Sequence, residues 1–202
     1  MRPARSEDTY DAVIVGARVA GAATALLLAR RGHRVLVVDQ DHPGRDTLST
    51  HALMRAGVVQ LQRWGLLDAV IAAGTPPVRR VTFRYRDTTV PINVAEPLYA
   101  PRRTVLDPML VAAAQDAGAE FAFGVRVDDV MRDAGGRVTG VRGRRRGGGP
   151  FTASATTTIG ADGRNSLIAH SVDAHTTRTR AAAGAVLYGY WSNVTVSDYE
   201  WC

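Results

Sequence analysis

The sequence contains a single cysteine, Cys202, at its last position. One cysteine can form neither a disulfide within the chain nor a cysteine-ligated metal cluster. The five histidines show no H-x-x-x-H spacing, which disfavours a metal enzyme. No stretch reaches the roughly 18 apolar residues that cross a membrane, and residues 1–10 are too polar for a secretory signal peptide. We therefore expect a cytoplasmic protein with no membrane span and no metal.

Lysine is absent as well: all 25 basic residues are arginine, and the net charge is +6. Four arginines, at positions 142 and 144–146, share one Gly-rich stretch. We interpret this stretch as the solvated tip of a hairpin between two strands, in preference to a phosphate-binding patch. A nucleic-acid-binding surface would need a basic face with interleaved aromatic side chains, or a known module. We therefore expect no nucleic-acid partner.

What the chain does contain is typical of a soluble globular protein with a sizeable core. Its 202 residues fit one large domain or two small ones, and hydrophobic residues make up 46% of them. Helical spacing of apolar residues predicts helices near 53–64 and from 103 to Gly118. Short apolar runs predict strands, with breaks at Pro97 and Pro101; the runs lie at 81–85, 90–94, 120–123, 125–131, 138–141 and 151–159.

The first forty residues read as a strand, a tight turn, a helix and a second strand. The apolar run 12–15 ends at Gly16, an Ala/Leu-rich stretch follows, and a second run ends at Asp39. Gly16 allows a sharp exit from the strand, and Gly21 allows the helix to pack closely. The free amides and dipole at the helix start form an anion site suited to a pyrophosphate. The Asp39 carboxylate can accept hydrogen bonds from ribose hydroxyls and disfavours a 2′-phosphate.

One position departs from the G-x-G-x-x-G pattern of such turns, because Arg18 replaces the middle glycine. Two interpretations are open. The turn is either a structural corner that binds nothing, or it binds a cofactor through its backbone while Arg18 adds a guanidinium near the phosphates or the ring. The full strand–turn–helix–strand–Asp context favours cofactor binding.

A second turn with polar residues follows the last long strand, at Asp162 and Gly163. It would place a carboxylate and bare backbone beside the first turn. The alternative is a purely structural turn with a helix cap. For His51, which precedes the second helix, a capping or surface role is favoured over catalysis.

Together these segments resemble the FAD-binding fold of class A flavoprotein monooxygenases, the para-hydroxybenzoate hydroxylase-like group. The geranylgeranyl reductases and flavin halogenases are related to this group. The motifs that carry the resemblance are D-A-V-I-V-G-A-R-V-A-G at 11–21, Asp39, R-x-x-L-x-x-x-L from Arg103 to Leu110, and G-A-D-G-R-N-S at 160–166.

The resemblance implies an α/β fold: a Rossmann-like FAD-binding domain of three layers with a β-meander, interrupted by strands of an incomplete substrate-domain sheet. The FAD-binding domain would comprise residues 1–77 and 98–175, and the partial substrate domain 78–97 and 176–202.

The resemblance also implies roles for individual residues. Gly16, Ala17, Ala20 and Gly21 would hold the FAD pyrophosphate. Arg18 would also be a cofactor-binding residue, since a similar subgroup of the family has arginine in place of the middle glycine. Asp39 would bind the adenosine ribose, and Arg103 would reach toward the ribityl–pyrophosphate region. The Val127 backbone would touch the adenine. Asp162 and Gly163 would serve both FAD and the incoming nicotinamide.

By resemblance, the protein is an FAD-dependent oxidoreductase, a monooxygenase that uses NAD(P)H as a transient reductant and hydroxylates a small organic substrate. The cofactor carries this chemistry, so we assign no catalytic residue. One alternative is a geranylgeranyl-reductase-like flavin reductase, and another is a non-catalytic FAD-binding fragment. Family members are longer and carry a third, G-D-containing motif that nothing after Ala181 matches. We therefore expect a truncated chain or a fragment of a longer protein.

Overall fold

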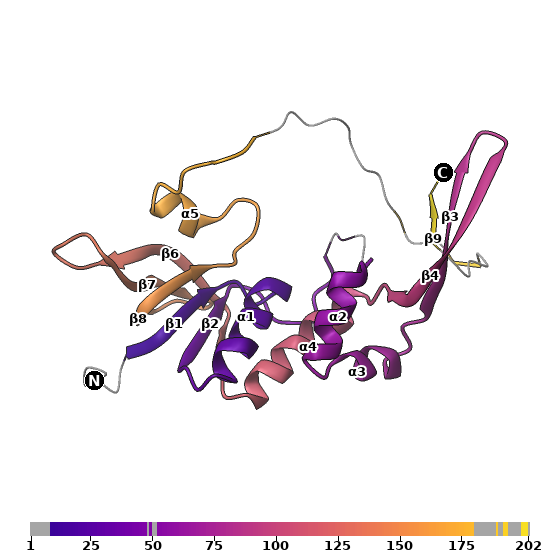
Figure 1. Ribbon diagram of the computed structural model, residues 1–202. Coiled ribbons are helices and arrows are strands. Elements are labelled where there is room, and N and C mark those ends of the chain that lie inside the picture. Colours follow the sequence, from indigo (N-terminus) through magenta and orange to yellow (C-terminus); the bar gives the residue numbers. More distant parts are fainter. Residues whose placement is uncertain are drawn as a thin grey trace. The chain divides into compact units, whose positions relative to one another are not determined.

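The computed structural model describes residues 9–47, 49, 52–179, 189, 192–193 and 199–201 (Figure 1). The chain forms two compact units, each built from two separate segments. The first unit comprises residues 1–48 and 102–174, and the second comprises 49–101 and 175–202. His51, for which a capping or surface role was favoured, lies outside the described residues.

A six-stranded mixed sheet organises the first unit, with the strand order β5-β2-β1-β8-β7-β6. The strand β1 is parallel to β2 and β8, and β2 is parallel to β5, whereas β6, β7 and β8 form an antiparallel meander. The bounds are β1 Thr9–Val15, β2 Val35–Asp39, β5 Glu120–Phe123, β6 Val125–Arg132, β7 Val138–Arg145 and β8 Pro150–Gly160. This arrangement confirms the predicted Rossmann-like α/β fold with its β-meander.

Both faces of the parallel strands are covered, which explains why β1 and β2 are continuous apolar runs rather than alternating ones. On one face, Val13 and Val38 join a core cluster with residues of the meander, among them Val141 and Phe151. On the other face, Ile14 lies beside helix α1 (Val19–Ala29), which packs against α4 (Arg103–Asp116). The three predicted layers are therefore the helices, the parallel strands, and the meander strands β6 and β7 of the same sheet, whose side chains pack with those of β1 and β2 (Figure 1).

A tyrosine near the start of β1 connects this inner strand to β5, the edge strand on the far side of β2. The Tyr10 hydroxyl donates a hydrogen bond of 2.7 Å to Glu120 Oε2 on β5, and the Arg34 guanidinium lies 4.5 Å from the ring centre. Burial, and next the hydrogen bond to Glu120, raises the pKa of Tyr10 above its ordinary value of 10.0.

This raised pKa makes stability dependent on pH in the alkaline range. Because the folded pKa exceeds the unfolded one, Tyr10 contributes stability that is complete below pH 10 and is lost as pH rises through the folded value. Arginine stays protonated there and lysine is absent, so tyrosine and cysteine are the side-chain types that titrate in this range, and the comparison with a Tyr10 variant isolates the contribution of Tyr10. We expect the urea midpoint to fall less steeply above pH 10 in Tyr10→Phe than in the unaltered chain. Equal slopes would contradict this account.

The arginine-rich stretch lies on a strand, so its interpretation as a hairpin tip is wrong for three of its four arginines. Residues 142, 144 and 145 belong to β7, and only Arg146 lies in the turn that follows. Arg142 pairs with Asp129 at 2.7 Å, and Arg144 with Asp128 at 3.3 Å, both acids on the neighbouring strand β6. The hydrogen bond from Arg142 is the main cause that lowers the pKa of Asp129. Cross-strand acids thus compensate much of this positive charge.

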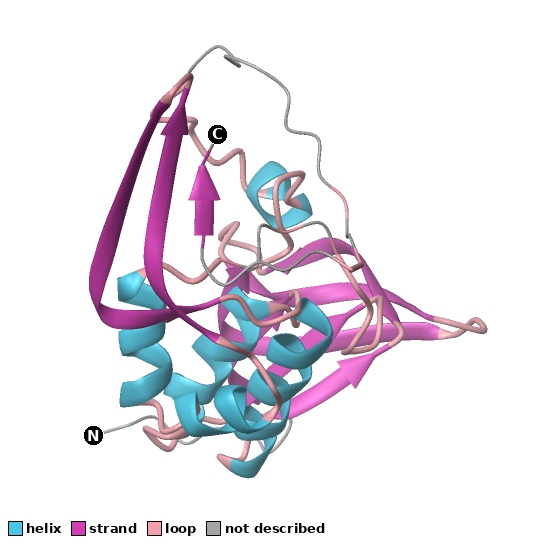
Figure 2. Ribbon diagram, turned by 90° about the vertical axis from the view of Figure 1, so that its right-hand side faces the viewer, coloured by secondary structure: helices cyan, strands magenta, loops and turns pink. Residues whose placement is uncertain are grey.

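The second unit contains helices α2 (Arg55–Arg63) and α3 (Leu67–Ala72) and a sheet of order β4-β3-β9. Figure 2 shows the two long strands of the hairpin, β3 (Pro77–Tyr85) and β4 (Thr88–Tyr99), beside the short β9 (Tyr199–Trp201). The helix α3 was not predicted. The predicted break at Pro97 is wrong, because Pro97 lies within β4. This strand is an edge strand whose register shifts just before Pro97, so no ladder amide is needed there.

The compact units do not follow the predicted domain boundaries at 77/78 and 97/98. Residues 49–77 cluster with the second unit, because α2 packs on β4 and the Leu53 amide donates a 2.8 Å hydrogen bond to the Tyr99 carbonyl oxygen. The division into an FAD-binding and a substrate domain stays a prediction.

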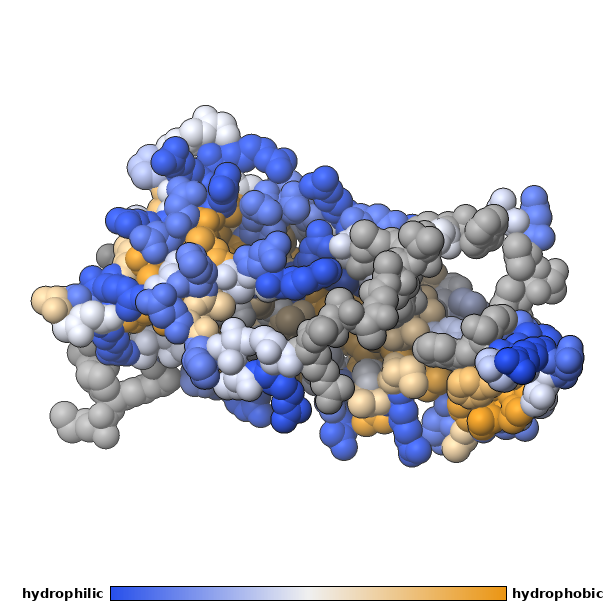
Figure 3. All heavy atoms as spheres, turned by 90° about the horizontal axis from the view of Figure 1, so that it is seen from above, coloured by the Kyte–Doolittle hydropathy of each residue, from blue (hydrophilic) through white to orange (hydrophobic). Residues whose placement is uncertain are grey.

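One face of the β3–β4 hairpin carries exposed apolar side chains. Phe83 and Val90 pair directly across the two strands and are 44% and 47% exposed, and Ile92 on the same face is 49% exposed. Figure 3 shows this apolar surface at the right-hand side, next to the charged tip of the hairpin. Contiguous apolar surface of this kind is available for contact with other protein.

Candidate functional site

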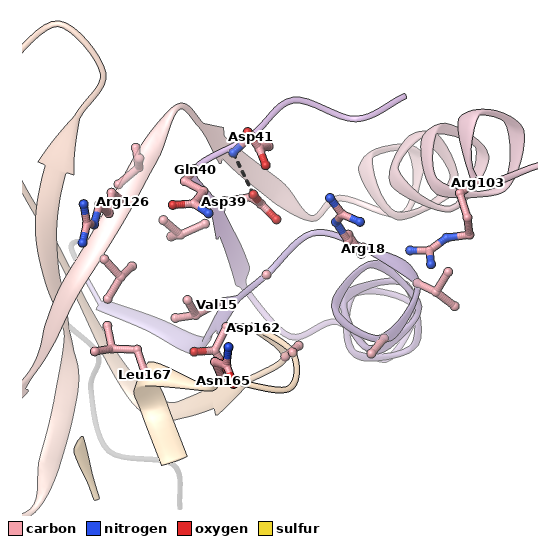
Figure 4. A pocket seen from close by; sticks show the side chains of 18 residues that line it. Val15, Arg18, Asp39, Gln40, Asp41, Arg103, Arg126, Asp162, Asn165 and Leu167 are labelled. Atoms are coloured by element: carbon pink, nitrogen blue, oxygen red, sulfur yellow. Dashed lines mark hydrogen bonds between the residues drawn. The ribbon is translucent and has the colours of Figure 1, made fainter. Parts of the chain in front are cut away.

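A cavity of about 720 Å³ opens in the first unit where β1, β2 and β8 end (Figure 4). Its lining includes Val15 at the end of β1, Asp39 at the end of β2 and Ala161 just after β8. The start of α1, the start of β6 and Arg103 of α4 complete it. Cofactors bind at this carboxyl edge in open parallel sheets, and the volume lies within the usual range for small-molecule pockets.

Two glycines of the first turn are required by the packing around them. Gly16 has a φ of +103°, and a Cβ there would lie 2.3 Å from the Ala161 carbonyl oxygen of the second turn. A Cβ on Gly21 would lie 1.8 Å from the Gly16 carbonyl oxygen, so Gly21 lets α1 begin directly against the turn. Both glycines therefore have the local roles predicted for them, and Gly16 also brings the two turns together.

The start of α1 offers backbone donors to this cavity. Val19 and Ala20 line it, and no side chain caps the helix. The first amides of a helix have no partner within the helix, and together with the dipole they attract anions. The Ala17 amide is committed elsewhere, because it donates to Asp39. Anion binding at this turn would therefore rest on the amides that follow Ala17.

Asp39 does more in the structure than its predicted role. Its Oδ2 accepts a 2.7 Å hydrogen bond from the Ala17 amide, and its Oδ1 accepts a 2.8 Å bond from the Asp41 amide (Figure 4). One carboxylate thus ties the first turn to the end of β2. Each oxygen keeps a second lone pair that can accept from a ligand hydroxyl.

Asp162 combines the two roles that the sequence left open. It lines the cavity with Gly163, whose φ is +90°. Its Oδ1 also accepts a 2.6 Å hydrogen bond from the Ser166 hydroxyl, and its Oδ2 a 3.2 Å bond from the Ile168 amide of α5 (Leu167–Ser171). Ser166 in turn caps this helix by accepting from the Ala169 amide at 3.0 Å. The side chain of Asp162 therefore organises the second turn beside the cavity.

An ion pair that sequence reasoning missed holds Arg103 at the cavity wall. Its Nε and Nη2 donate to the two oxygens of Asp107 at 2.6 and 2.8 Å, and Asp107 is only 4% exposed. The spacing of four residues between an arginine and an aspartate on a predicted helix was the available signal. Arg103 and Val127, a buried residue of β6, both line the cavity, and their predicted contacts with FAD stay predictions.

Asp107→Asn is expected to destabilise the chain by about 3 kcal/mol, since removing one partner of a buried pair leaves the other uncompensated. The shift of the urea unfolding midpoint, at an unchanged m-value, measures this loss of stability. Asp116→Asn, at an exposed position on the same helix, is the matched control and should stay within about 0.5 kcal/mol of the unaltered chain. If both variants unfold at the same urea concentration, the pair contributes nothing to stability.

Comparison with known proteins identifies the family to which the chain belongs. The profile of the FAD binding domain family matches residues 9–199. The chain belongs to this FAD-binding family. Among the described residues no group of three or more His, Cys, Asp or Glu could hold a metal ion. Nor does that part of the chain include a helix long and apolar enough to span a membrane.

Two curated proteins similar to this chain are an oxidoreductase and a reductase by name. The chain is 33% identical over 186 residues to the probable electron transfer flavoprotein-quinone oxidoreductase YdiS of Escherichia coli, covering 83% of this chain and 39% of YdiS. It is 34% identical to the menaquinone reductase of Mycolicibacterium smegmatis, covering 65% and 33%. The chain thus spans well under half the length of these relatives.

Among solved structures, the fold is similar to that of the myxobacterial chondrochloren halogenase CndH, described as a variant of FAD-dependent halogenases. The TM-score is 0.73 at 24% identity, covering 81% of this chain and 39% of CndH. At 24% identity, this similarity concerns the fold alone.

The structural features of the cavity are compatible with an FAD molecule. The two glycines allow the first turn, α1 and the second turn to pack tightly at the cavity edge, and the start of α1 carries no side-chain cap that an anion would have to displace. Asp39 and Asp162 place acceptors on either side. A dinucleotide needs such a surface, with donors for its diphosphate and acceptors for its ribose hydroxyls.

Proposed function

We propose that this chain is the FAD-holding part of an FAD-dependent oxidoreductase. The observation that carries the proposal is the glycine turn between β1 and α1, which borders the cavity in a chain matched by the FAD binding domain family. Each side chain or amide at this edge has a chemistry that suits one portion of the dinucleotide. The proposal is therefore specific enough to assign residues.

In this assignment the diphosphate lies against the first turn, bordered by Gly16, Ala17, Arg18, Ala20 and Gly21, and accepts hydrogen bonds from the amides that follow Ala17, because the Gly16 and Ala17 amides donate within the fold. Asp39 binds the adenosine ribose and at the same time positions the turn through the Ala17 amide. The Val127 backbone borders the adenine. Arg103 faces the diphosphate and ribityl region, and Asp162 with Gly163 serves FAD and the incoming nicotinamide.

FAD would supply the redox chemistry, since it accepts and donates electron pairs that side chains cannot. The residues of this chain bind it, orient it and compensate its charge, and none of them is assigned as catalytic. For the whole protein we propose NAD(P)H as the transient reductant and hydroxylation of a small organic substrate as the reaction.

Reduction without oxygen is the second candidate function, either of a quinone or of an isoprenoid double bond. The names of the two curated relatives, a quinone oxidoreductase and a menaquinone reductase, favour it. The two candidates share the FAD-holding part and differ in what accepts the electrons.

An assay on the FAD-loaded chain separates them. NADH or NADPH is added with and without air, and with and without a soluble quinone such as menadione, while the visible flavin band and nicotinamide oxidation are followed. Oxygen-dependent turnover that puts one oxygen atom into an added organic substrate and the other into water, instead of releasing hydrogen peroxide, supports the monooxygenase, and anaerobic turnover that requires quinone supports the reductase. A bound flavin that neither nicotinamide reduces would contradict the proposed reductant.

A further inference from the structure

Arg18 stands where the turn motif has its middle glycine, and its backbone does not need a glycine. Its φ of −79° and ψ of −169° are extended values that any residue adopts. The left-handed torsion of the turn belongs to Gly16, and the close approach of α1 belongs to Gly21. The reason for a particular residue at position 18 is therefore to be sought in its side chain.

The Arg18 side chain differs from the other charged side chains that line the cavity. Asp39, Arg103 and Asp162 each have a hydrogen-bond partner within the fold. Asp41 pairs with Arg45 at 2.9 Å, and Arg126 lies 3.8 Å from Asp128. Within the described part of the chain, the half-buried guanidinium of Arg18 has neither an ion pair nor a hydrogen bond.

The position of Arg18 indicates which kind of ligand its guanidinium would bind. It precedes the first residue of α1, so its charge adds to that of the uncapped helix amides, and in Figure 4 it lies between Asp39 and Arg103. The charge of Arg103 is largely compensated by Asp107, so Arg18 is the main source of uncompensated positive charge at this turn. A guanidinium binds phosphate oxygens through two parallel hydrogen bonds, which are stronger than bonds between neutral groups.

We propose that Arg18 binds the diphosphate of the cofactor and replaces the close backbone approach that a glycine would allow. This proposal rests on the proposed function, because it takes the cavity as the FAD site. It has a consequence opposite to the one that the motif alone suggests. Arg18→Gly, which restores the glycine pattern, weakens FAD binding.

The experiment measures the affinity of the full chain for FAD by quenching of flavin fluorescence, at low and at high salt. Arg18→Met removes the charge at similar length, Arg18→Gly restores the motif, and Arg18→Lys keeps a charge without the planar fork. Charged hydrogen bonds of this kind are worth about 10- to 100-fold in affinity. We expect that loss in the Met and Gly variants, a smaller loss in the Lys variant, and a weaker salt dependence in Met and Gly.

Arg31→Met is the matched control, since it removes the same charge at the far end of α1, where Arg31 contacts the Leu27 carbonyl oxygen. Competition by ADP and by adenosine locates the effect. Arg18→Met should weaken ADP as a competitor and leave adenosine unchanged, because adenosine has no phosphate. Should the Met and Gly variants unfold, Arg18→Lys tests the same point, because losing the planar fork should weaken ADP as a competitor and leave adenosine unchanged.

Two results would overturn the proposal. One is that Arg18→Gly binds FAD as tightly as the unaltered chain or more tightly, and the other is that ADP and adenosine lose affinity equally. These results differ from failure of the proposed function, in which the unaltered chain itself would not bind FAD.

Discussion

Gly21→Val is expected to abolish FAD binding. A Cβ at this position would lie 1.8 Å from the Gly16 carbonyl oxygen and 3.3 Å from the Ile14 side chain, so α1 must move away from the turn to accommodate it. That movement separates the first amides of α1 from the rest of the cavity lining. The Gly16 carbonyl oxygen is backbone and cannot move aside as the end of a flexible side chain can. Overpacking of this kind also lowers stability by about 1–3 kcal/mol.

The matched control is Gly32→Ala, at the other end of the same helix. Gly32 has a φ of +77°, so an alanine there is strained, but a Cβ would meet nothing within 4 Å. It should cost about 1 kcal/mol of stability and leave the FAD affinity unchanged. FAD titrations and thermal unfolding of both variants measure the two effects separately. If folded Gly21→Val binds FAD like Gly32→Ala, the turn is not where the cofactor is held.

Asp39→Ala is expected to weaken FAD binding about 10- to 100-fold. The change removes the acceptor proposed for the ribose and also the acceptor of the Ala17 and Asp41 amides, so the turn loses its attachment to β2. Asp39→Asn should be nearly as impaired, because the amide group offers one acceptor oxygen where two backbone donors need acceptors.

Fluorescence titration of FAD measures this loss, and hydrogen exchange of the Ala17 amide reports the turn itself. Asp116→Ala, an exposed acid on α4, controls for the loss of one negative charge. Should Asp39→Ala bind FAD within about twofold of the control, neither role of Asp39 would stand. Faster exchange at Ala17 with unchanged affinity would leave only the structural role.

The sequence predicted the strand–turn–helix–strand unit well because every signal in it is local. The apolar runs of β1 and β2 end at Gly16 and Asp39, and Gly32 marks the end of α1. The helix begins at Val19, three residues before the Ala/Leu-rich stretch, because the turn residues themselves form its first turn. Periodicity and glycine positions were sufficient here.

Features that depend on pairing between distant residues could not be predicted in the same way. On β7, Arg142 lies opposite Asp129 of β6 and Arg144 pairs with Asp128 of the same strand, and these contacts depend on the register of the two strands. Pro97 is tolerated because β4 is at an edge. In each case the deciding contact is made by a residue that local pattern does not identify.

The site shows the same division. The lining by Arg103, Val127 and Asp162 was anticipated from the family's motifs, whereas the Ala17 amide on Asp39 and the burial of Asp107 emerge only in three dimensions. These contacts change the interpretation of the residues involved. Asp39 positions the turn in addition to its proposed role in binding the ribose, and Arg103 is held with its charge largely compensated, which leaves Arg18 as the main free charge.

The most direct test of the central claim is a titration of the purified chain with FAD, followed by the visible spectrum and by flavin fluorescence. The account predicts saturable binding of one FAD per chain, with quenched fluorescence, displacement by ADP, and loss of binding in Gly16→Val. A folded chain, with the helix and strand content of the unaltered fold by circular dichroism, that neither quenches nor retains flavin would contradict it.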